Sequence, residues 1–416
     1  MWIFCICIQI RDAMGVQDNI SHVLPGGLDL SGVPLFCGAQ GAFVFDSAGN
    51  SYLDLISGYG TVIAGHANEA IVEEVAKTLR TGHYMYGHHD LLSSLGKRLT
   101  ALFPGTVDAL FFKTGSEAVQ CAARLVRATT RRERILRCGF HGWHDQFMTE
   151  NVSWHDYGRD PVFKGVVAGV PTTSGNIVTR VTLDAESLEV ELSKGDVAAL
   201  ILDPVQLIAP YQERLRDVRE RCWAHGALLI IDESKTGFRV SPAGVQGLLN
   251  LYGDVTILSK AVANGFPLSV VLASEYVLAE RQNAKIMGTY NEELSALAAA
   301  KATLDIVFER KAWQELKERG DWLLGRVNED LQSAGCPAFS LAGYRWSCMP
   351  VLVHRGDAVG SSRELLSIVA QKLLERRILW LPHHMNFLSL AVDFDSLAEF
   401  AKTLVEICAE VERDKS

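Results

Sequence analysis

Four short apolar runs in this sequence end in side chains that can do chemistry. The runs within "LFFKTGS", "VAALILDP", "ALLIIDE" and "VTILSK" lead, in that order, to Thr114 to Ser116, Asp203, Asp232 and Lys260. Charges in such places can be solvated groups at the point where a buried strand reaches the surface. A lysine withdrawn from bulk water can instead lose its proton and attack an aldehyde as an amine nucleophile.

Asp232 and the turn around Gly115 could add two further functions to Lys260. A nearby aspartate can keep a pyridine nitrogen protonated, which makes the ring an electron sink. Backbone N–H groups at a helix start, with the Ser116 hydroxyl, can bind phosphate, and Gly115 would allow its close approach. A hydroxyl residue before Glu117 is also typical of a plain helix cap. An aldehyde, a pyridine nitrogen and a phosphate occur together in pyridoxal phosphate, so the set favours this cofactor.

The elements that must position these residues alternate along the chain. Short apolar runs typical of buried strands are separated by amphipathic segments such as "SEAVQCAARLVRATT" and "RDVRERCWAHG". This alternation predicts an α/β fold with a mainly parallel sheet and helices on both faces. Ligands in such sheets bind beyond the carboxyl ends of the strands, where the candidate residues lie.

The two ends of the chain predict a second, smaller domain. The segment "GAFVFDSAGNSYLDL" reads as a hairpin around a Gly-Asn turn. After about residue 310 a helical segment, "KAWQELKERGDWLLGRVNEDLQSAG", precedes further short strands and a final helix. We therefore predict a small domain formed by residues 1–60 and 311–416, and a large cofactor-binding domain formed by residues 61–310.

Composition excludes several classes of protein. The chain has 416 residues, of which 48% are hydrophobic and 21% charged, as in an ordinary globular protein. A net charge of -9 without a basic block argues against nucleic acid and anionic membranes as partners. The nine cysteines form no CxxC pair and no zinc-type spacing, so we expect no metal site. Reduced thiols favour a cytoplasmic protein.

The apolar amino terminus, "MWIFCICIQIRDAMG", does not change that expectation. It lacks a basic segment before the apolar run and a small-residue cleavage site after it. The run is also too short to cross a bilayer as a helix. A strand, an interface segment, or a true start at Met14 are the alternatives.

Seven segments in this order resemble the class III (fold type I) pyridoxal-phosphate aminotransferases. They are "YLDLISGYGTVIAGHA", "TGSEAVQCAARLVRA", "GFHGWHD", "LDP", "IDESKTGFR", "LSKAVANGFP" and "GTYNEELSALAA". The chain length and the motif sequences are most similar to the glutamate-1-semialdehyde aminomutase-like branch. The resemblance extends from about "LPGG" at residue 24 to "FLSLAVDF" near residue 394. The resemblance implies a large domain with a mainly parallel seven-stranded sheet and a smaller α+β domain built from both chain ends.

The resemblance also implies roles for single residues. Lys260 matches the lysine that forms the Schiff base and then shuttles a proton, and Asp232 matches the partner of the pyridine nitrogen. Phe140 matches the aromatic that stacks on the ring, although it also reads as a core residue. Thr289 matches a threonine that reaches the phosphate of the other subunit, which implies a homodimer. The complete expected cofactor-binding set is Gly115, Ser116, Phe140, His141, Asp203, Asp232, Ser234, Lys260 and Thr289.

Four positions depart from the family pattern. Ser234 stands where an apolar residue usually packs on the ring, and Lys235 stands where glutamine or methionine is frequent beside the ring hydroxyl. Asp203 replaces a glutamate, and Ser259 replaces the glycine before the Schiff-base lysine. No catalytic group is lost, and the changes indicate a cofactor environment adapted to an unusual substrate.

The arginines that clamp a substrate carboxylate in relatives are missing from their usual segments. None occurs between Arg377 and Arg413, and "LPGGLDLSGVP" has none either. We therefore expect an amino-acid donor and an acceptor without an α-carboxylate, such as an oxidised sugar, an aminoglycoside-type intermediate or an aliphatic amine. Arg239 and Arg345 are the alternative carboxylate clamps.

The expected activity is amino transfer between two small molecules on a homodimer. An aminomutase or an epimerase would use the same residues, and no motif separates these from a transaminase. A non-catalytic cofactor-binding protein is a further alternative, disfavoured because Lys260 is retained.

Overall fold

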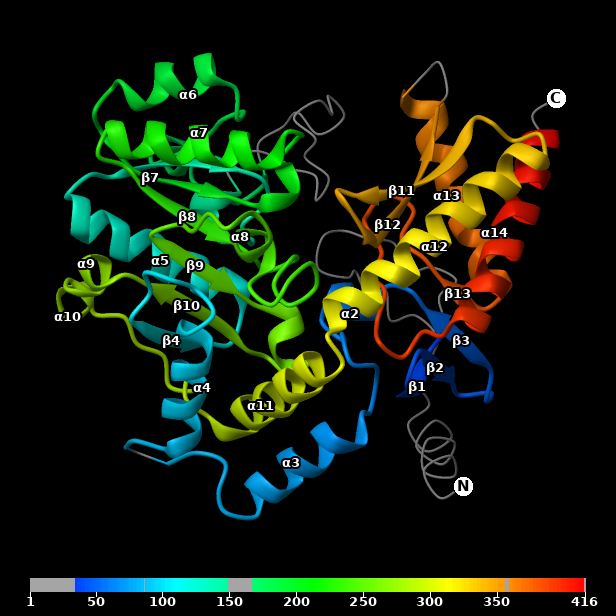
Figure 1. Ribbon diagram of the computed structural model, residues 1–416, viewed down its shortest axis with the longest axis horizontal. Coiled ribbons are helices and arrows are strands. Elements are labelled where there is room, and N and C mark those ends of the chain that lie inside the picture. Colours follow the sequence, from blue (N-terminus) through cyan, green and yellow to red (C-terminus); the bar gives the residue numbers. More distant parts are fainter. Residues whose placement is uncertain (1–33, 86, 149–166, 356–358, 415–416) are drawn as a thin grey trace.

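The computed structural model describes residues 34–85, 87–148, 167–355 and 359–414 of the chain. It shows two groups of elements side by side, a larger one around an extended sheet and a smaller one (Figure 1). The predictions made for the amino-terminal apolar run and for "LPGG" lie outside the described residues. In the described ranges, no helix is both long enough and apolar enough to cross a membrane.

The larger group is built on a sheet of seven strands. In spatial order these are β4 (Asp108–Phe112), β10 (Ser269–Ala273), β9 (Val255–Leu258), β8 (Leu228–Asp232), β7 (Val197–Leu202), β5 (Arg134–Cys138) and β6 (Val178–Arg180). Only β10 runs antiparallel to both of its neighbours. Every residue of β7, β9 and β10 is buried, as expected for strands covered on both faces. The predicted mainly parallel seven-stranded sheet is confirmed.

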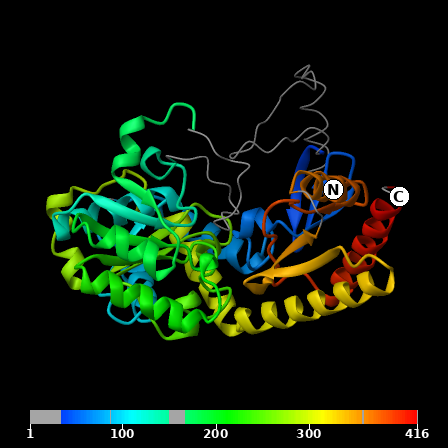
Figure 2. The ribbon, with the colours of Figure 1, turned by 90° about the horizontal axis from the view of Figure 1, so that it is seen from above.

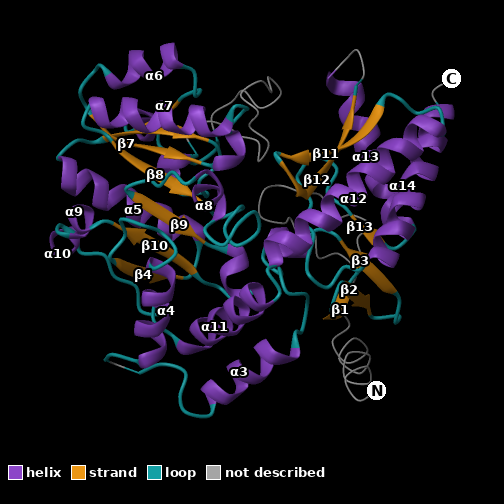
Figure 3. Ribbon diagram, viewed as in Figure 1, coloured by secondary structure: helices purple, strands orange, loops and turns teal. Residues whose placement is uncertain are grey.

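Helices cover both faces of this sheet (Figure 3). The bounds are α3 (Glu69–Leu79), α4 (Asp90–Thr100), α5 (Gly115–Thr130), α6 (Ala185–Leu192), α7 (Tyr211–Ala224), α8 (Gly244–Leu249), α9 (Glu275–Leu278), α10 (Arg281–Ala284) and α11 (Leu294–Glu309). On one face α5 forms an apolar cluster with the sheet, and on the other face α6, α7 and α8 form a second cluster. Burial of these amphipathic faces holds the strand ends in place.

The smaller group combines segments from both ends of the described chain. Its elements are β1 (Phe36–Gln40), β2 (Phe43–Asp46), β3 (Ser51–Asp54), α2 (Ser57–Gly60), α12 (Ala312–Ser333), β11 (Phe339–Tyr344), β12 (Trp346–His354), α13 (Val359–Glu375), β13 (Ile378–Leu379) and α14 (Phe394–Arg413). β2 and β3 form the predicted hairpin, and β13 adds to β3 in parallel. Figure 2 shows the long helix α12 extending along this group. The domain limits given above stay a prediction.

Candidate active site

The candidate residues lie at the carboxyl ends of three neighbouring parallel strands. Leu202 of β7 is in register with Ile231 of β8, and Asp232 is in register with Ile257 of β9. Asp203 follows β7 directly, and Lys260 follows β9 after one residue. The sheet therefore brings side chains from distant parts of the sequence to one edge.

Lys260 begins a short 3₁₀ turn, η5 (Lys260–Ala263), immediately beyond β9. Its backbone has a φ of 46°, in the left-handed region that non-glycine residues rarely occupy. The side chain is half-buried, and Nζ donates to the carbonyl of Tyr59 at 3.1 Å. Burial, followed by the positive charge of Lys235, lowers the pKa of Lys260 to about 8. A larger fraction of this amine than of an ordinary lysine is thus unprotonated near neutral pH.

Asp232 is buried, and hydrogen bonds hold both of its carboxylate oxygens. Oδ2 lies 2.9 Å from Nδ1 of His141, whose Nε2 lies 3.2 Å from the carbonyl of Cys138. Oδ1 accepts from the Ser234 hydroxyl at 2.6 Å and from the Ser234 backbone N–H at 3.1 Å. Burial acts to raise the pKa of Asp232, but the contacts with His141 and Ser234 outweigh it, so the pKa is lowered. The result is a fixed, ionised carboxylate.

His141 and Ser234, both predicted to bind the cofactor, lie against Asp232. The two ring nitrogens of His141 face two acceptors, the Asp232 carboxylate and the Cys138 carbonyl, which fix the orientation of the ring. The Ser234 hydroxyl is turned toward Asp232, and Oγ would lie 3.7 Å from a Cβ placed on Gly115. The departure from an apolar residue at position 234 therefore adds a donor to the carboxylate.

The start of α5 lies beside this group. Thr114 caps the helix in a reciprocal capping box with Glu117, so the plain-cap interpretation is correct for Thr114. Gly115 is the first helical residue, and a Cβ placed on it would lie 3.5 Å from Ser259 Oγ. The Ser116 hydroxyl accepts from the backbone N–H of Trp143 at 3.3 Å. Phosphate binding by Gly115 and Ser116 stays a prediction.

Asp203 forms a buried ion pair with Lys235. Oδ2 of Asp203 contacts Nζ of Lys235, and the two side chains are 2% and 6% exposed. Oδ1 of Asp203 accepts from the backbone N–H of Val205 at 3.3 Å. Asp203, predicted as a cofactor contact, is therefore engaged by Lys235, which follows Asp232 by three residues.

Phe140 and Thr289 differ in their exposure to solvent. Phe140 is half-buried on the turn after β5, and Thr289 is exposed in the segment between α10 and α11. Among the residues that the structure describes, no hydrogen bond joins Thr289 to the rest of the predicted set. Their contacts with a cofactor stay predictions.

Sequence reasoning missed two residues next to Lys260. Tyr59 supplies the carbonyl that receives Lys260, and its ring lies edge-on to His384 with centroids 6.1 Å apart. Burial, together with the positive charges of Lys235 and Lys260, lowers the pKa of His384 to about 3, although a backbone contact with Met385 opposes this. The available signals were the Gly-Tyr-Gly triplet at residues 58–60 and the histidine doublet at 383–384.

The two arginines considered as alternative carboxylate clamps differ in burial and in the hydrogen bonds that hold them. Arg239 is 1% exposed, donates to the carbonyls of Leu388 and Gly60, and lies 5.0 Å over the Phe387 ring. Arg345 is half-buried at the tip between β11 and β12, and its Nε donates to the carbonyl of Val205. The guanidinium of Arg239 is therefore part of the scaffold.

Comparison with known proteins identifies the family. The family Aminotransferase class-III matches residues 34–335. The chain belongs to the class III aminotransferases. It is 34% identical to 2'-deamino-2'-hydroxyneamine transaminase of Streptomyces kanamyceticus over 64% of this chain and 65% of that protein, which is less than two thirds of the relative's length. It is 30% identical to glutamate-1-semialdehyde 2,1-aminomutase of Methanothrix thermoacetophila over 78% of this chain and 79% of that one.

Solved structures of proteins with bound pyridoxal phosphate share the fold. The FumI protein of Sphingopyxis sp. MTA144, solved as the internal aldimine form with pyridoxal phosphate, superimposes with a TM-score of 0.82. That match covers 100% of this chain and 97% of the other at 23% identity. Pyridoxal phosphate is the cofactor of this class III aminotransferase.

The residues of this class III aminotransferase fit that cofactor. Lys260 offers an amine of lowered pKa, Asp232 offers a fixed carboxylate, and α5 offers a helix start that begins with glycine. The space above Gly115, bounded by two serine hydroxyls, would be narrowed by any side chain placed there. Among the described residues, no three His, Cys, Asp or Glu side chains form a group that could hold a metal ion.

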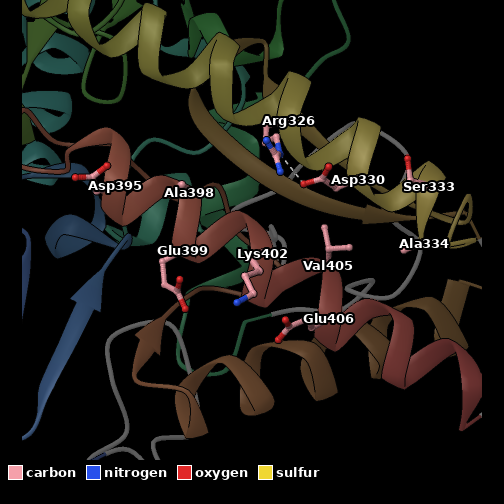
Figure 4. A pocket seen from close by; sticks show the side chains of 10 residues that line it. All are labelled: Arg326, Asp330, Ser333, Ala334, Asp395, Ala398, Glu399, Lys402, Val405 and Glu406. Carbon is pink, nitrogen blue, oxygen red and sulfur yellow. Dashed lines mark hydrogen bonds and ion pairs between the residues drawn. The ribbon is translucent and has the colours of Figure 1, made fainter.

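A surface hollow of about 690 Å³ lies away from these groups, between α12 and α14 (Figure 4). Its lining is Arg326, Asp330, Ser333, Ala334, Asp395, Ala398, Glu399, Lys402, Val405 and Glu406. Arg326 pairs with Asp330 across one turn of α12. The hollow contains none of the residues predicted for the site.

Proposed function

We propose that this enzyme moves an amino group from an amino-acid donor to a carbonyl acceptor, with Lys260 and Asp232 as its catalytic residues. One observation carries the proposal. The amine of Lys260, with its lowered pKa, and the fixed carboxylate of Asp232 stand at the ends of adjacent strands. A base and an anchored anion in this arrangement suit proton transfer at a carbon attached to an electron sink.

The residues divide this chemistry between them. Pyridoxal phosphate supplies the aldehyde that takes up the amino group and the ring that accepts electrons. Asp232 holds a proton at the ring nitrogen, while His141 and Ser234 keep its carboxylate in place. Lys260 holds the cofactor between turnovers, then takes a proton from the donor carbon and returns it to the acceptor. The turn at Gly115 and Ser116 would receive the phosphate, and Phe140 would cover the ring.

An acceptor without an α-carboxylate, of the oxo-sugar or aminoglycoside type, fits this site best. Arg239 is fixed by two backbone carbonyls and the Phe387 ring, so it does not serve as a carboxylate clamp. The relative from Streptomyces kanamyceticus, 34% identical, carries the name of an aminoglycoside transaminase. The name of this relative supports a role in amino sugar biosynthesis.

We further propose that the enzyme is a homodimer with Thr289 reaching the phosphate of the other subunit. Its neighbours Met287 and Tyr290 are 84% and 69% exposed. The backbone N–H of Leu294 donates to the carbonyl of His83, so the segment that carries exposed Tyr84 lies beside the segment that carries Thr289. Exposed apolar side chains in such a group are typical of an interface.

A cytoplasmic location is also a proposal. Its support is that the seven cysteines in the described ranges form no disulfide with one another, and six of them lie in the apolar core clusters. Cysteines without disulfides are typical of a reducing compartment.

The test follows the visible absorption of the purified holoenzyme as single amino donors are added. A donor that abolishes the cofactor band and releases an equivalent of oxo acid, followed by recovery of the band with an oxo-sugar acceptor, is the expected result. Such recovery with α-keto acids but with no amino-sugar precursor would overturn the proposed acceptor class.

An aminomutase is the second candidate, because relatives of that name are 30% identical over most of the chain. The same experiment separates the two activities. A mutase converts its substrate into an isomer without releasing an oxo acid, whereas a transaminase needs a second substrate to complete the cycle.

A further inference from the structure

Two lysines with different partners share the site. Nζ of Lys235 contacts the Asp203 carboxylate, and both side chains are almost fully buried. Nζ of Lys260 donates to a backbone carbonyl, that of Tyr59, and to no carboxylate among the described residues. Because only Lys235 has a carboxylate partner, Lys235 is the lysine whose positive charge is stabilised at this edge of the sheet.

The strand order keeps this charge next to Lys260. Asp203 follows β7, Lys235 belongs to the turn after β8, and Lys260 follows β9, so the three residues come from adjacent strands. Lys235 acts electrostatically on Lys260 and on His384, the residue beside Tyr59. A buried positive charge penalises a second one nearby.

We propose that Lys235, held by Asp203, is a positioning residue that keeps a positive charge beside Lys260 and so leaves Lys260 the nucleophilic amine of the two. This inference rests on the role proposed above for Lys260. The proposal gives a role to the lysine at position 235, where the family frequently has glutamine or methionine. The Asp203 carboxylate holds the positive charge of Lys235 in place.

The other charged and titratable groups around Lys260 act in both directions. They are Asp232 and Asp203, which favour its protonated form, Lys235 and Arg239, which oppose it, and the buried ring of His384 with its neighbour Tyr59. Burial is the largest cause of the lowered pKa, and Lys235 is the largest charge effect. Removing the charge at position 235 should therefore raise the pKa of Lys260.

The test measures the amine of Lys260 directly in the cofactor-free full-length protein. A small acylating reagent modifies only unprotonated amines, so the labelling of Lys260, quantified by mass spectrometry between pH 6 and 10, gives its titration midpoint. Exposed Lys285 serves as the internal reference. The wild-type midpoint is expected near pH 8.

Four variants separate charge from structure. Lys235→Met should move the midpoint upward, with labelling at pH 7 reduced about tenfold for each pKa unit. Lys235→Arg keeps the charge and should keep the midpoint. Lys235→Met combined with Asp203→Leu replaces the whole ion pair by apolar groups, which favours folding, and should also move the midpoint upward. Lys372→Met breaks the pair with Glu410 in the small domain and should change nothing.

An unchanged titration midpoint of Lys260 in both Lys235→Met and the double variant would overturn the proposal. A midpoint shift in Lys235→Arg as large as that in Lys235→Met would also overturn it. A purely structural role for Lys235 would alter folding, seen by circular dichroism, without a charge-dependent midpoint. The labelling does not depend on turnover. A failure of the proposed amino transfer would instead appear as a holoenzyme whose spectrum does not respond to donors.

Discussion

Asp232 shows how a single carboxylate is prepared for its task. Its two oxygens face the His141 ring on one side and Ser234 on the other, within a buried strand end. Hydrogen bonds to an ionised carboxylate are stronger than those between neutral groups, and they fix its direction. The negative charge is therefore maintained despite burial.

We predict that Asp232→Asn keeps the fold and the cofactor but loses most activity. The amide has the size of the carboxylate but cannot stabilise a proton on the ring nitrogen. Turnover should fall by at least about 100-fold, as when an electrostatic stabiliser is removed. The measurements are the amino-transfer rate and the absorbance of bound cofactor, with Lys260→Ala as the background. Turnover equal to wild type would exclude Asp232 as the partner of the ring nitrogen.

Single functional residues could be predicted where they directly follow an apolar run in the sequence. Lys260 and Asp232 each follow a run of apolar residues, and this spacing is visible in the sequence. The contact of His141 with Asp232 joins positions 91 residues apart, and the Lys260 contact with Tyr59 joins positions 201 apart. Such pairings depend on the order of strands in the sheet, which periodicity does not encode.

Among the elements, α8 is held by a buried carboxylate. The side chain of Glu233, the residue after Asp232, accepts from the backbone N–H groups of Val245 at 3.0 Å and Gln246 at 2.9 Å. Burial raises the pKa of Glu233 to about 7. Gly244 begins the helix with a φ of 62°, and a Cβ placed there would overlap the Glu233 carboxylate. The turn between β8 and α8 is thus built around one side chain.

We predict that Gly244→Ala lowers the free energy of unfolding by about 3 kcal/mol, the sum of left-handed strain and overpacking. Gly195→Ala is the matched control, since its φ is 76° and nothing lies within 4 Å of the added Cβ. That variant should lose only about 1 to 2 kcal/mol, from strain alone. Urea unfolding followed by fluorescence compares them. Equal losses in the free energy of unfolding of the two variants would show that the Glu233 side chain moves away from the added Cβ at no energetic cost.

The sheet and its covering helices were predictable because buried strands and amphipathic helices have distinct periods. The reversed direction of β10 was not, because its sequence, "SVVLA", is as apolar as that of a parallel strand. Direction is set by the connection from β9 through the turn after Lys260, whose length does not require a crossover helix.

For the whole molecule, the exposed apolar side chains beside Thr289 predict self-association. Tyr290→Glu places a charge in the proposed interface and should shift sedimentation from dimer toward monomer. Trp223→Glu changes an aromatic on α7 that is even more exposed, at 83%, and should leave the dimer intact. A wild-type protein that sediments as a monomer at concentrations where it is active would contradict the proposed contact of Thr289 with a second subunit.

The parallel pairing of β3 with β13 also has a consequence for how the enzyme is made. Ile378 lies opposite Leu53, and the Ser57 hydroxyl donates to the carbonyl of Phe387, 330 residues further along the chain. The segment that presents the Tyr59 carbonyl to Lys260 is thus anchored on a residue synthesised 330 positions after Ser57. Contacts this distant in sequence form late. A nascent chain can assemble its central sheet but should hold the Tyr59 carbonyl beside Lys260 only after residues 378–387 have been synthesised.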